Sequence, residues 1–544
     1  MACLTMINCG GITAMSVIWA GSPRTMPKCS VPNWTQPSHN RRQMLRTCFT
    51  TAASSPLIRF SMVSSSKGFF MQDYASQQID AAVEAAAQAF TPWSETSGTT
   101  RQALLNGLAT ALEQNAETLV ALADQETSLG PVRLNGELAR TTFQLRRFGD
   151  IAAAGVPFAY LDDPAVAGAP PAGHPDMAMI RVPLGPVAMF AVSNFPFAFS
   201  VLGGDTASAL AAGCSVVVKA HPGHPQLSRA VYALIQQVLE QQQLPAGVLS
   251  FVEGAGNEVG SYLVQHPQIA AAAFTGSTRG GLALQALANA RTRPIPFYGE
   301  LGAVNPVLAL PAALTAGGEA LAQTLAGSIT MGCGQFCTNP GTLVVLDDPA
   351  TDTFLAQLQS ALRELHPHAM LTEGMSSAFA SGIARQQQLG AEVLLHNEPA
   401  GDAPGAFLAS VSATDYLSQP EWQEEVFGPS SLVVRCNDVQ QVLDVLHAIG
   451  GSLTVTVWGA EQADADIRAL VRTATQIAGR VLFKGVPTGV AVTAAQMHGG
   501  PFPASTAPLT TSVGDSALDR FLRPVALQDM PEWLVTEYRA RADA

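Results

Sequence analysis

The chain has 544 residues, of which 47% are hydrophobic, and it carries a formal net charge of −13 with an isoelectric point near 5.2. This length predicts about three or four domain-sized units with large buried cores. The acidic charge argues against nucleic acid or an anionic membrane as a partner, because both attract a basic surface. These values favour an enzyme that acts on a small molecule.

The first 70 residues differ from the rest in composition. Residues 1–72 carry seven basic side chains, no acid before Asp73, and four of the eight cysteines. We therefore expect residues 1–70 to be a disordered or non-native extension, with the true start near Met62 or Met71. The basic, Ser-rich composition also resembles a transit peptide, and the apolar residues 15–20 resemble a signal sequence. However, no positive charge precedes this apolar stretch, and it is too short to span a bilayer.

The remaining cysteines are Cys214, Cys333, Cys337 and Cys436. They form neither zinc-type pairs nor a disulfide framework, so we expect a reducing cytoplasm. No His or carboxylate lies at ligand spacing around Cys333 and Cys337, so no metal is expected.

Helical and strand-like patterns alternate along the main body. Residues 73–150 read as amphipathic helices, with Ile79, Val83 and Phe90 on one stripe and Leu104, Leu108 and Leu112 on another. Strands are then predicted over 185–192, 214–219, 248–252 and 270–275, separated by helices over 203–212, 227–242 and 259–266. This βαβ rhythm predicts an α/β fold whose parallel sheet binds ligands at the carboxyl ends of its strands.

A second α/β segment is predicted over residues 297–496, with strands at 304–308, 342–346, 431–434 and 453–458. The stretch from Arg291 to Pro294 is the predicted domain boundary. We thus expect a Rossmann-like dinucleotide-binding domain over 71–296, a catalytic domain over 297–496 and a C-terminal segment over 497–544.

Several strand ends carry side chains suited to a cofactor. The run from Gly254 to Gly260 has the spacing GxGxxxG, one residue longer than the dinucleotide fingerprint, and is read as a turn. Ser277, in Thr275-Gly276-Ser277-Thr278, is either a phosphate contact or an ordinary helix N-cap. Lys219 at a strand end is either a ribose or phosphate ligand or a solvated lysine. Asn194 is either an oxyanion donor or a turn former.

The pair formed by Cys337 and Glu300 is the strongest sign of catalysis. Small, flexible residues surround Cys337, and Glu300 lies 37 positions before it. A cysteine thiolate can attack a carbonyl carbon, and a carboxylate can activate water against the resulting thioester. A packed, inert cysteine is the alternative.

Taken together, these motifs resemble the aldehyde dehydrogenase superfamily in order and spacing over roughly residues 71–534. The motifs are Asn194-Phe195-Pro196-Phe197, Val218-Lys219, Phe274-Thr275-Gly276-Ser277, Glu300-Leu301-Gly302, Gln335-Phe336-Cys337 and Glu425-Val426-Phe427-Gly428-Pro429. The resemblance implies two doubly wound parallel-sheet domains plus a small oligomerisation element near residues 157–181, completed by the C-terminal tail. It also implies a homodimer or homotetramer.

The resemblance also assigns roles. Cys337 would be the nucleophile, Glu300 the group that activates water, and Asn194 a donor to the oxyanion. Cofactor positions are implied for Pro196, Lys219, Gly276, Ser277, Glu425 and Phe427.

One departure from the family pattern concerns the cofactor. Members that prefer NAD usually carry Glu three residues after the strand-end lysine, where this chain has Pro222. Without that carboxylate a 2′-phosphate meets no like charge, and His221 or His224 is available to assist it. We therefore expect NADP to be used, with NAD also accepted.

Within the superfamily, the runs 195–224 and 334–341 look most like α-ketoglutaric semialdehyde (2,5-dioxopentanoate) dehydrogenases, with NADP-linked fatty aldehyde dehydrogenases as the runner-up. A CoA-acylating enzyme is disfavoured, because such members generally lack the glutamate at Glu300. A catalytically silent homologue is disfavoured because Cys337, Asn194 and Glu300 are all present. Residues 498–503 are expected by resemblance to shape the substrate pocket, and which aldehyde binds there is left open.

Overall fold

A computed structural model describes residues 8–9, 12–13 and 66–542 of the chain. Near the N-terminus, strands β1 (Asn8–Cys9) and β2 (Ile12–Thr13) pair antiparallel. The other residues before Ser66, including most of the expected extension, lie outside the described residues. A separate compact unit begins at Ser66 with helix α1 (Ser66–Ser94), so the last residues of the expected extension are helical. None of the described helices combines the length and apolarity that a membrane crossing requires. The expected cytoplasmic location stays a prediction.

The first part of this unit is helical, as predicted. Helix α1 is followed by α2 (Gly98–Gln114), α3 (Ala116–Thr127) and α4 (Pro131–Ala153). The predicted stripes are largely buried: Ile79, Val83, Leu104, Leu108 and Leu112 are inside, and Phe90 is half-buried. Two of these helix starts have a local cause. The Ser97 hydroxyl accepts the N–H of Thr100 at the start of α2, and Pro131 occupies the first turn of α4.

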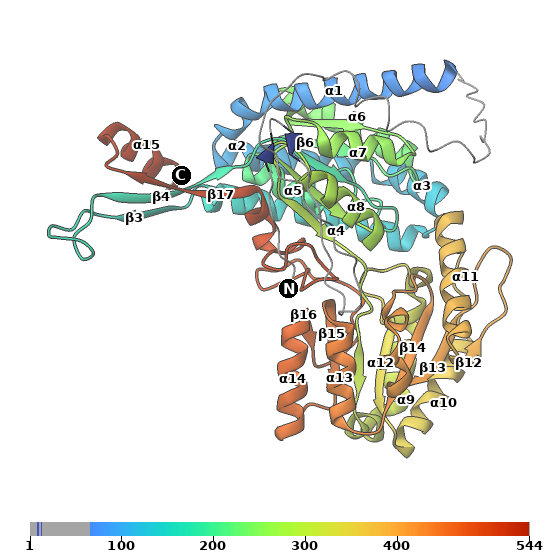
Figure 1. Cartoon of the computed structure of the whole chain (residues 1–544). Helices are drawn as coiled ribbons and strands as arrows, with labels where there is room; N and C mark the ends of the chain where they lie inside the picture. The colour runs from blue at the N-terminus through green and yellow to red at the C-terminus, as the bar shows by residue number, and fades with distance from the viewer. Residues whose placement is uncertain (1–7, 10–11, 14–65, 543–544) are drawn as a thin grey trace, which may run out of the picture. The chain divides into compact units, whose positions relative to one another are not determined.

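The first sheet has five parallel strands in the order β7-β6-β5-β8-β9. The strands are β5 (Val187–Phe190), β6 (Val216–Lys219), β7 (Leu249–Val252), β8 (Ala271–Thr275) and β9 (Phe297–Glu300). Helices α5 (Gly204–Ala212), α6 (Pro225–Gln241), α7 (Asn257–Gln265) and α8 (Thr278–Asn289) alternate with them and flank the sheet (Figure 1). The strands and helices predicted between residues 185 and 275 are confirmed; the four strands and α5 are shorter than predicted, and α6 and α7 begin two residues earlier.

Strand β9 corrects the predicted domain boundary. It pairs in parallel with β8, with Thr275 opposite Glu300, so the first sheet extends past residue 296. The stretch from Arg291 to Pro294 is only the loop between α8 and β9. Because β9 has only four residues and follows a proline, it shows no periodic pattern in the sequence. The sequence pattern therefore predicts the domain boundary before this strand. Glu300 therefore ends a strand of the first sheet.

The second sheet has seven strands in the order β12-β13-β14-β11-β10-β15-β16, parallel except for the edge strand β12. The strands are β10 (Val307–Ala309), β11 (Thr342–Leu346), β12 (Glu392–His396), β13 (Phe407–Ser412), β14 (Ser430–Cys436), β15 (Ser452–Trp458) and β16 (Ala478–Leu482). Its helices are α9 (Pro311–Thr330), α10 (Pro349–Arg363), α11 (Glu373–Gln388), α12 (Ala413–Ser418), α13 (Val439–Ile449) and α14 (Ala465–Ile477). The strands predicted at 342–346, 431–434 and 453–458 are confirmed, whereas the strand predicted at 304–308 overlaps β10 only at Val307 and Leu308.

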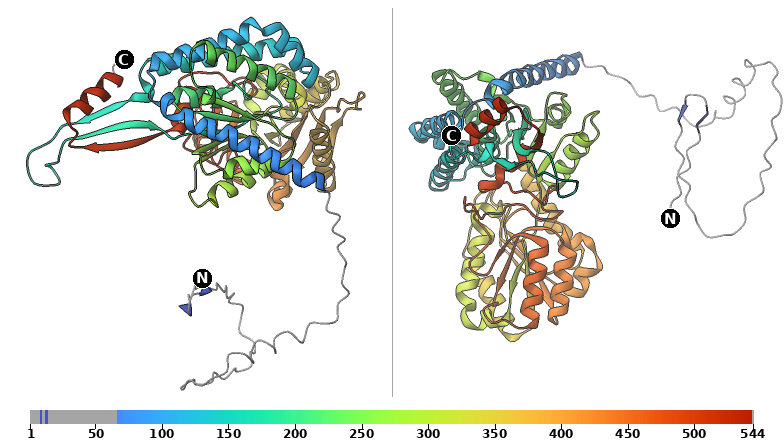
Figure 2. Two further views of the ribbon diagram at one scale, coloured as in Figure 1. Left: turned by 90° about the horizontal axis from the view of Figure 1, so that it is seen from above. Right: turned by 90° about the vertical axis from the view of Figure 1, so that its left-hand side faces the viewer.

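A third, antiparallel sheet extends away from the other two (Figures 1 and 2). It joins β3 (Tyr160–Asp163), β4 (Met177–Pro183) and β17 (Leu522–Gln528), and helix α15 (Glu532–Ala542) lies beside it. Residues near 157–181 and the C-terminal tail thus form one element, as the resemblance implied. We call this element the arm. Short 3₁₀ helices lie at η1 (Val156–Phe158), η2 (Ala246–Val248), η3 (Met331–Gly334), η4 (Pro420–Gln423) and η5 (Asp515–Phe521).

An irregular segment before β17 connects both large sheets. Its Ala504 carbonyl accepts the N–H of Leu301, just after β9, at 2.8 Å, and its Phe502 carbonyl accepts the N–H of Gly451, just before β15, at 3.1 Å. A buried ion pair between Arg520 and Asp205 of α5, 2.7 Å apart, anchors the end of this segment. Residues 498–513 are consequently held where the two sheets meet.

Candidate active site

The loop that carries Cys337 is shaped by residues with left-handed backbone conformations. After α9 ends at Thr330, Gly332, Cys333 and Gly334 have φ values of 56°, 58° and 64°. A Cβ atom on Gly334 would lie 2.1 Å from the carbonyl oxygen of Gly428, so this position requires glycine. The chain turns sharply here and presents Cys337 toward the end of β9.

Asn305 fixes the far side of this loop. Its φ is 45° and its side chain is fully buried. The amide nitrogen donates to the carbonyls of Cys337, at 2.8 Å, and Asn339, at 3.0 Å, while the amide oxygen accepts the N–H of Thr454 at 3.2 Å. The sequence reasoning missed this residue. Asparagine tolerates positive φ, but that tendency alone does not reveal partners up to 149 positions away.

Cys337 is the reactive candidate among the four described cysteines. Cys214, Cys333 and Cys436 are buried, whereas Cys337 is only partly buried, and all four are free thiols. Burial raises the pKa of Cys333 to about 12, which fits the expected packed residue rather than a redox partner. The nucleophile predicted from the sequence is therefore also the accessible thiol.

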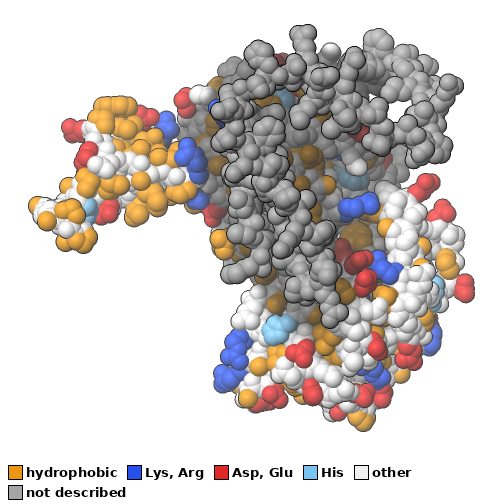
Figure 3. Space-filling view, in the orientation of Figure 1, with side chains coloured by type: hydrophobic (Ala, Val, Ile, Leu, Met, Phe, Trp, Pro, Cys, Tyr) orange, Lys and Arg blue, Asp and Glu red, His pale blue; other side chains and the backbone are white. Residues whose placement is uncertain are grey.

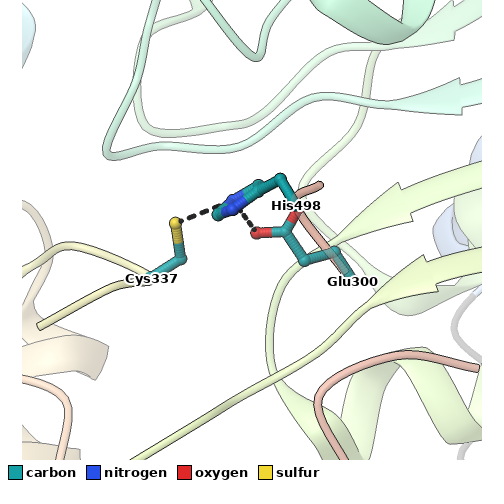
Figure 4. A group of neighbouring side chains, drawn as sticks. All are labelled: Glu300, Cys337 and His498. Carbon is teal, nitrogen blue, oxygen red and sulfur yellow. Dashed lines mark hydrogen bonds and ion pairs between the residues drawn. The ribbon is translucent and has the colours of Figure 1, made fainter. Parts of the chain in front are cut away.

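Three side chains from distant parts of the chain meet at this point (Figure 4). The sulfur of Cys337 lies 3.5 Å from Nε2 of His498, and the same nitrogen lies 3.0 Å from Oε1 of Glu300. The hydroxyl of Ser512 donates to Oε2 of Glu300 at 2.6 Å. Glu300 and Cys337 are together as predicted, and His498 stands between them.

This cluster corrects the argument that no metal ligand lies near Cys337, which considered only residues close to it in the sequence. A His and a carboxylate do lie beside Cys337, and the three ligand atoms are within 4.8 Å of one another. They come from residues 37 positions before and 161 positions after the cysteine, which a search at ligand spacing along the sequence cannot find. The geometry could hold a metal ion, and the expectation that none binds stays a prediction.

The electrostatics of the cluster set its resting protonation. Burial, then the charge of Glu300, and further the charge of Glu425 raise the pKa of Cys337 well above its usual range, while Arg140 opposes them. Burial would also raise the pKa of Glu300, but the charge of His498 and the hydroxyl of Ser512 outweigh it and the pKa is lowered. The resting site thus holds a thiol beside an ionised carboxylate that can accept a proton.

Asn194 lies against the cysteine loop. It follows β5, and its Nδ2 donates to the carbonyl of Gln335 at 3.0 Å, two residues before the nucleophile. Its own carbonyl accepts from the guanidinium of Arg133 at 2.6 Å. Asn194, the expected oxyanion donor, therefore lies after the carboxyl end of β5 and beside the loop of Cys337.

The predicted cofactor residues gather at the same edge of the first sheet. Lys219 is the last residue of β6, half-buried, and burial lowers its pKa. Ser277 follows β8 and caps α8, its hydroxyl accepting the N–H of Gly280 at 3.2 Å, so the N-cap reading is correct. Ser277 and Gly276 are nevertheless exposed, which leaves the first turn of α8 open to a phosphate.

The other predicted cofactor residues are Pro196, Glu425 and Phe427. Pro196 is buried, and Phe427 is half-buried. Burial raises the pKa of Glu425 to about 7, and the charge of this carboxyl acts on Cys337. Glu425 Oε2 lies 2.4 Å from the point where a Cβ of Gly302 would be, so the carboxylate packs closely against this glycine.

The structure removes one suggested phosphate contact. His224 is fully buried, with Nε2 at 2.7 Å from the carbonyl of Val192 and Nδ1 at 3.0 Å from the Ser228 hydroxyl. The suggestion that it assists a 2′-phosphate is wrong, because both nitrogens already have partners. His221 is partly exposed, and burial lowers its pKa to about 3, so it is available only as a neutral group.

Comparison with known proteins agrees with this geometry. The model of the aldehyde dehydrogenase family matches residues 61–500. This chain belongs to the aldehyde dehydrogenase family. It is 42% identical over 473 residues to "Alpha-ketoglutaric semialdehyde dehydrogenase 2" of Azospirillum brasilense, covering 85% of this chain and 89% of that protein. It is 40% identical over 475 residues to "Alpha-ketoglutaric semialdehyde dehydrogenase" of Acinetobacter baylyi, covering 86% and 90%.

A solved structure shows the same fold. The 1-pyrroline-5-carboxylate dehydrogenase from Thermus, determined with bound NAD, superimposes with a TM-score of 0.71 at 23% identity, covering 83% of this chain and 86% of that chain. The aldehyde dehydrogenase fold inferred from the motifs is thereby confirmed. As a member of this family, the protein is an aldehyde-oxidising enzyme that uses NAD(P).

The pKa shifts predict how the free enzyme reacts with iodoacetamide. Because the pKa of Cys337 lies well above its usual range, the inactivation rate should rise about tenfold per pH unit between about pH 6 and 9 without levelling off. Changing Glu300→Gln removes a charge that disfavours the thiolate, so inactivation at pH 7.5 should become faster. The exposed Glu240→Gln is the matched control and should behave as wild type. A plateau below pH 8, or slower inactivation of the Glu300→Gln enzyme, would contradict this electrostatic account.

Proposed function

We propose that this enzyme oxidises 2,5-dioxopentanoate to 2-oxoglutarate, with NADP as its preferred cofactor and NAD also accepted. The observation that carries the substrate is the similarity of 42% and 40%, over most of the chain, to two proteins named for that semialdehyde. The neighbourhood of Cys337, Glu300 and Asn194 supplies the groups that such an oxidation needs.

The first chemical step is the attack of sulfur on the aldehyde carbon. The Cys337 thiol must lose its proton, and the ionised Glu300 carboxylate beside it is the base that accepts this proton. Nε2 of His498 lies 3.0 Å from Oε1 of Glu300 and 3.5 Å from the sulfur, so it holds the carboxylate and the thiol together. The amide of Asn194 and the backbone N–H of Cys337 then donate to the oxyanion. Glu300 passes the proton to solvent before the thioester is hydrolysed.

Hydrolysis of the thioester completes the reaction. A nicotinamide held at this sheet edge would supply the acceptor for the hydride of the tetrahedral carbon, and loss of that hydride would leave a thioester of Cys337. Glu300 is ionised and held by Ser512, and it takes a proton from water as that water attacks the thioester carbon. The acid leaves, and the sulfur regains a proton. His498 and Ser512 are thus added to the residues that the resemblance assigned.

The residues at the sheet edge suit a dinucleotide. Lys219 reaches outward from β6, and the exposed first turn of α8 offers N–H groups at Ser277. Pro222 is exposed and uncharged, so no carboxylate at that position repels a 2′-phosphate. The nearby Glu253 is already paired with Arg229 at 2.9 Å. These features support NADP.

The arm supports assembly into a homodimer or homotetramer. Hydrophobic side chains gather on it (Figure 3), including Leu161, Met179 and Trp533, which are 58%, 42% and 66% exposed. Apolar side chains on an extended sheet and helix are typical of a surface that a partner covers. A second copy of the chain is the occupant that the family resemblance implies, and a monomer in sedimentation velocity would contradict it.

The substrate proposal is tested by initial rates of NADPH formation with 2,5-dioxopentanoate and with decanal. We expect the larger kcat/KM with the dioxo acid, and Cys337→Ala should abolish turnover of both while cofactor still binds. A larger kcat/KM with decanal would instead assign the enzyme to fatty aldehydes. Product that appears only when coenzyme A is present would assign an acylating enzyme.

The cofactor proposal is tested by Pro222→Glu. A carboxylate at this position should repel the 2′-phosphate and lower kcat/KM for NADP by at least about tenfold, with little change for NAD. The exposed Gln237→Glu on α6 adds the same charge elsewhere and should leave both values unchanged. A kcat/KM of the wild-type enzyme that is high with NAD and much lower with NADP would contradict the proposal.

A further inference from the structure

One face of α4 lies against the reaction site. Arg133, Glu137 and Arg140 are spaced four and three residues apart, which places them on the same side of a helix. Oε1 of Glu137 accepts the N–H groups of Phe197 and Ala198 at 2.8 and 2.9 Å. This face therefore packs on the segment after β5 that carries Asn194.

Arg140 has an uncommitted guanidinium next to the reacting groups. Its guanidinium lies over the ring of Phe199, 5.2 Å from the centroid, and that ring is 6.5 Å from the ring of His498. Nη2 reaches the carbonyl of Val490 only at 3.5 Å, and Nη1 is buried without a hydrogen-bond partner among the described residues. Its charge lowers the pKa of Cys337, so it acts on the reaction centre itself.

Two other arginines near the site donate to backbone carbonyls, although Arg133 Nη1 and Arg480 Nε are also buried without a hydrogen-bond partner among the described residues. Arg133 donates to the Asn194 carbonyl at 2.6 Å and lies over the rings of Phe195 and Phe336. Arg480 donates to the carbonyls of Pro487 and Gly489 at 2.6 and 2.9 Å. Both make backbone hydrogen bonds of 2.6 to 2.9 Å, whereas the hydrogen bond of Arg140 to the Val490 carbonyl is 3.5 Å long.

A carboxylate is the ligand that such a group is built to take. A buried guanidinium N–H without an acceptor has lost its hydrogen bonds to water and gained none in return, which costs free energy. A planar carboxylate can accept hydrogen bonds from two such N–H groups at once. Next to Arg140, an apolar cluster contains Val192, Phe199 and Val513, with Val490 and Val492 packed on it. This wall suits the methylene carbons of a short chain.

We propose that Arg140 binds the C1 carboxylate of the substrate while its C5 aldehyde lies at Cys337, so that Arg140 selects an oxo acid over an uncharged aldehyde. This inference rests on the proposed function, since it names the group that recognises the acid end of 2,5-dioxopentanoate. Without such a cation, the carboxylates of Glu300 and Glu425 would disfavour an anionic substrate.

The test compares 2,5-dioxopentanoate with pentanal, which has the same chain length and no acid, in the full-length wild-type, Arg140→Gln and Arg140→Lys enzymes. We expect the ratio of kcat/KM for the oxo acid to that for pentanal to fall about a hundredfold or more in Arg140→Gln, chiefly through KM of the oxo acid. Arg140→Lys should recover part of the ratio. Arg146→Gln, on the same helix but paired with Glu113 on the surface, is the matched control and should leave the ratio unchanged.

The outcomes separate this inference from the proposed function. A wild-type enzyme that does not prefer the oxo acid to pentanal would overturn the proposed function and this inference with it. A wild-type preference that survives in Arg140→Gln would overturn the inference alone. Equal losses of kcat/KM with both aldehydes in Arg140→Gln would also overturn the inference, because they would show that Arg140 has a structural role. A lower thermal unfolding temperature of this variant would identify such a role. Binding of 2-oxoglutarate, measured by calorimetry, should weaken in Arg140→Gln in parallel with the ratio.

Discussion

The carboxylate of Glu300 lies where three parts of the chain meet. It ends β9 of the first sheet, it lies 3.0 Å from His498, and it accepts the hydroxyl of Ser512. His498 in turn reaches the sulfur of Cys337. Because the loop of Cys337 belongs to the second sheet through Asn305 and Thr454, this one side chain lies where both sheets and the C-terminal segment converge.

The same arrangement sets the balance of charge around the thiol of Cys337. Glu300 and Glu425 both disfavour a thiolate at Cys337, so the resting nucleophile keeps its proton and is protected from indiscriminate reaction. His498 lies between the thiol and the Glu300 carboxylate, and Arg140 supplies a compensating cation. An anionic oxo acid with an aldehyde at its other end would complete this set of charges, which links the mechanism to the choice of substrate.

The sequence predicted the fold class, the strands and the nucleophile, because each depends on local patterns or motifs. Apolar runs between glycines showed β5, β6 and β8, and the motif around Cys337 identified the family. The sequence could not show that His498, Ser512 and Asn305 belong to the site. The hydrogen bonds that place them there join residues 14 to 212 positions apart, and only the folded chain brings these residues together. It also did not reveal β9, whose four residues carry no period, and it suggested His224 as a phosphate contact because a short run of sequence does not show burial.

The central claim is that Glu300 discharges an acyl group from Cys337, and it is tested most directly by trapping that acyl group. The Glu300→Gln enzyme would be mixed with NADP and 2,5-dioxopentanoate, quenched in acid, digested and analysed by mass spectrometry. The account predicts a burst of NADPH equal to the enzyme present and a peptide that carries the substrate's acyl group on Cys337. An adduct on another cysteine, or steady turnover at the wild-type rate with no adduct, would contradict it.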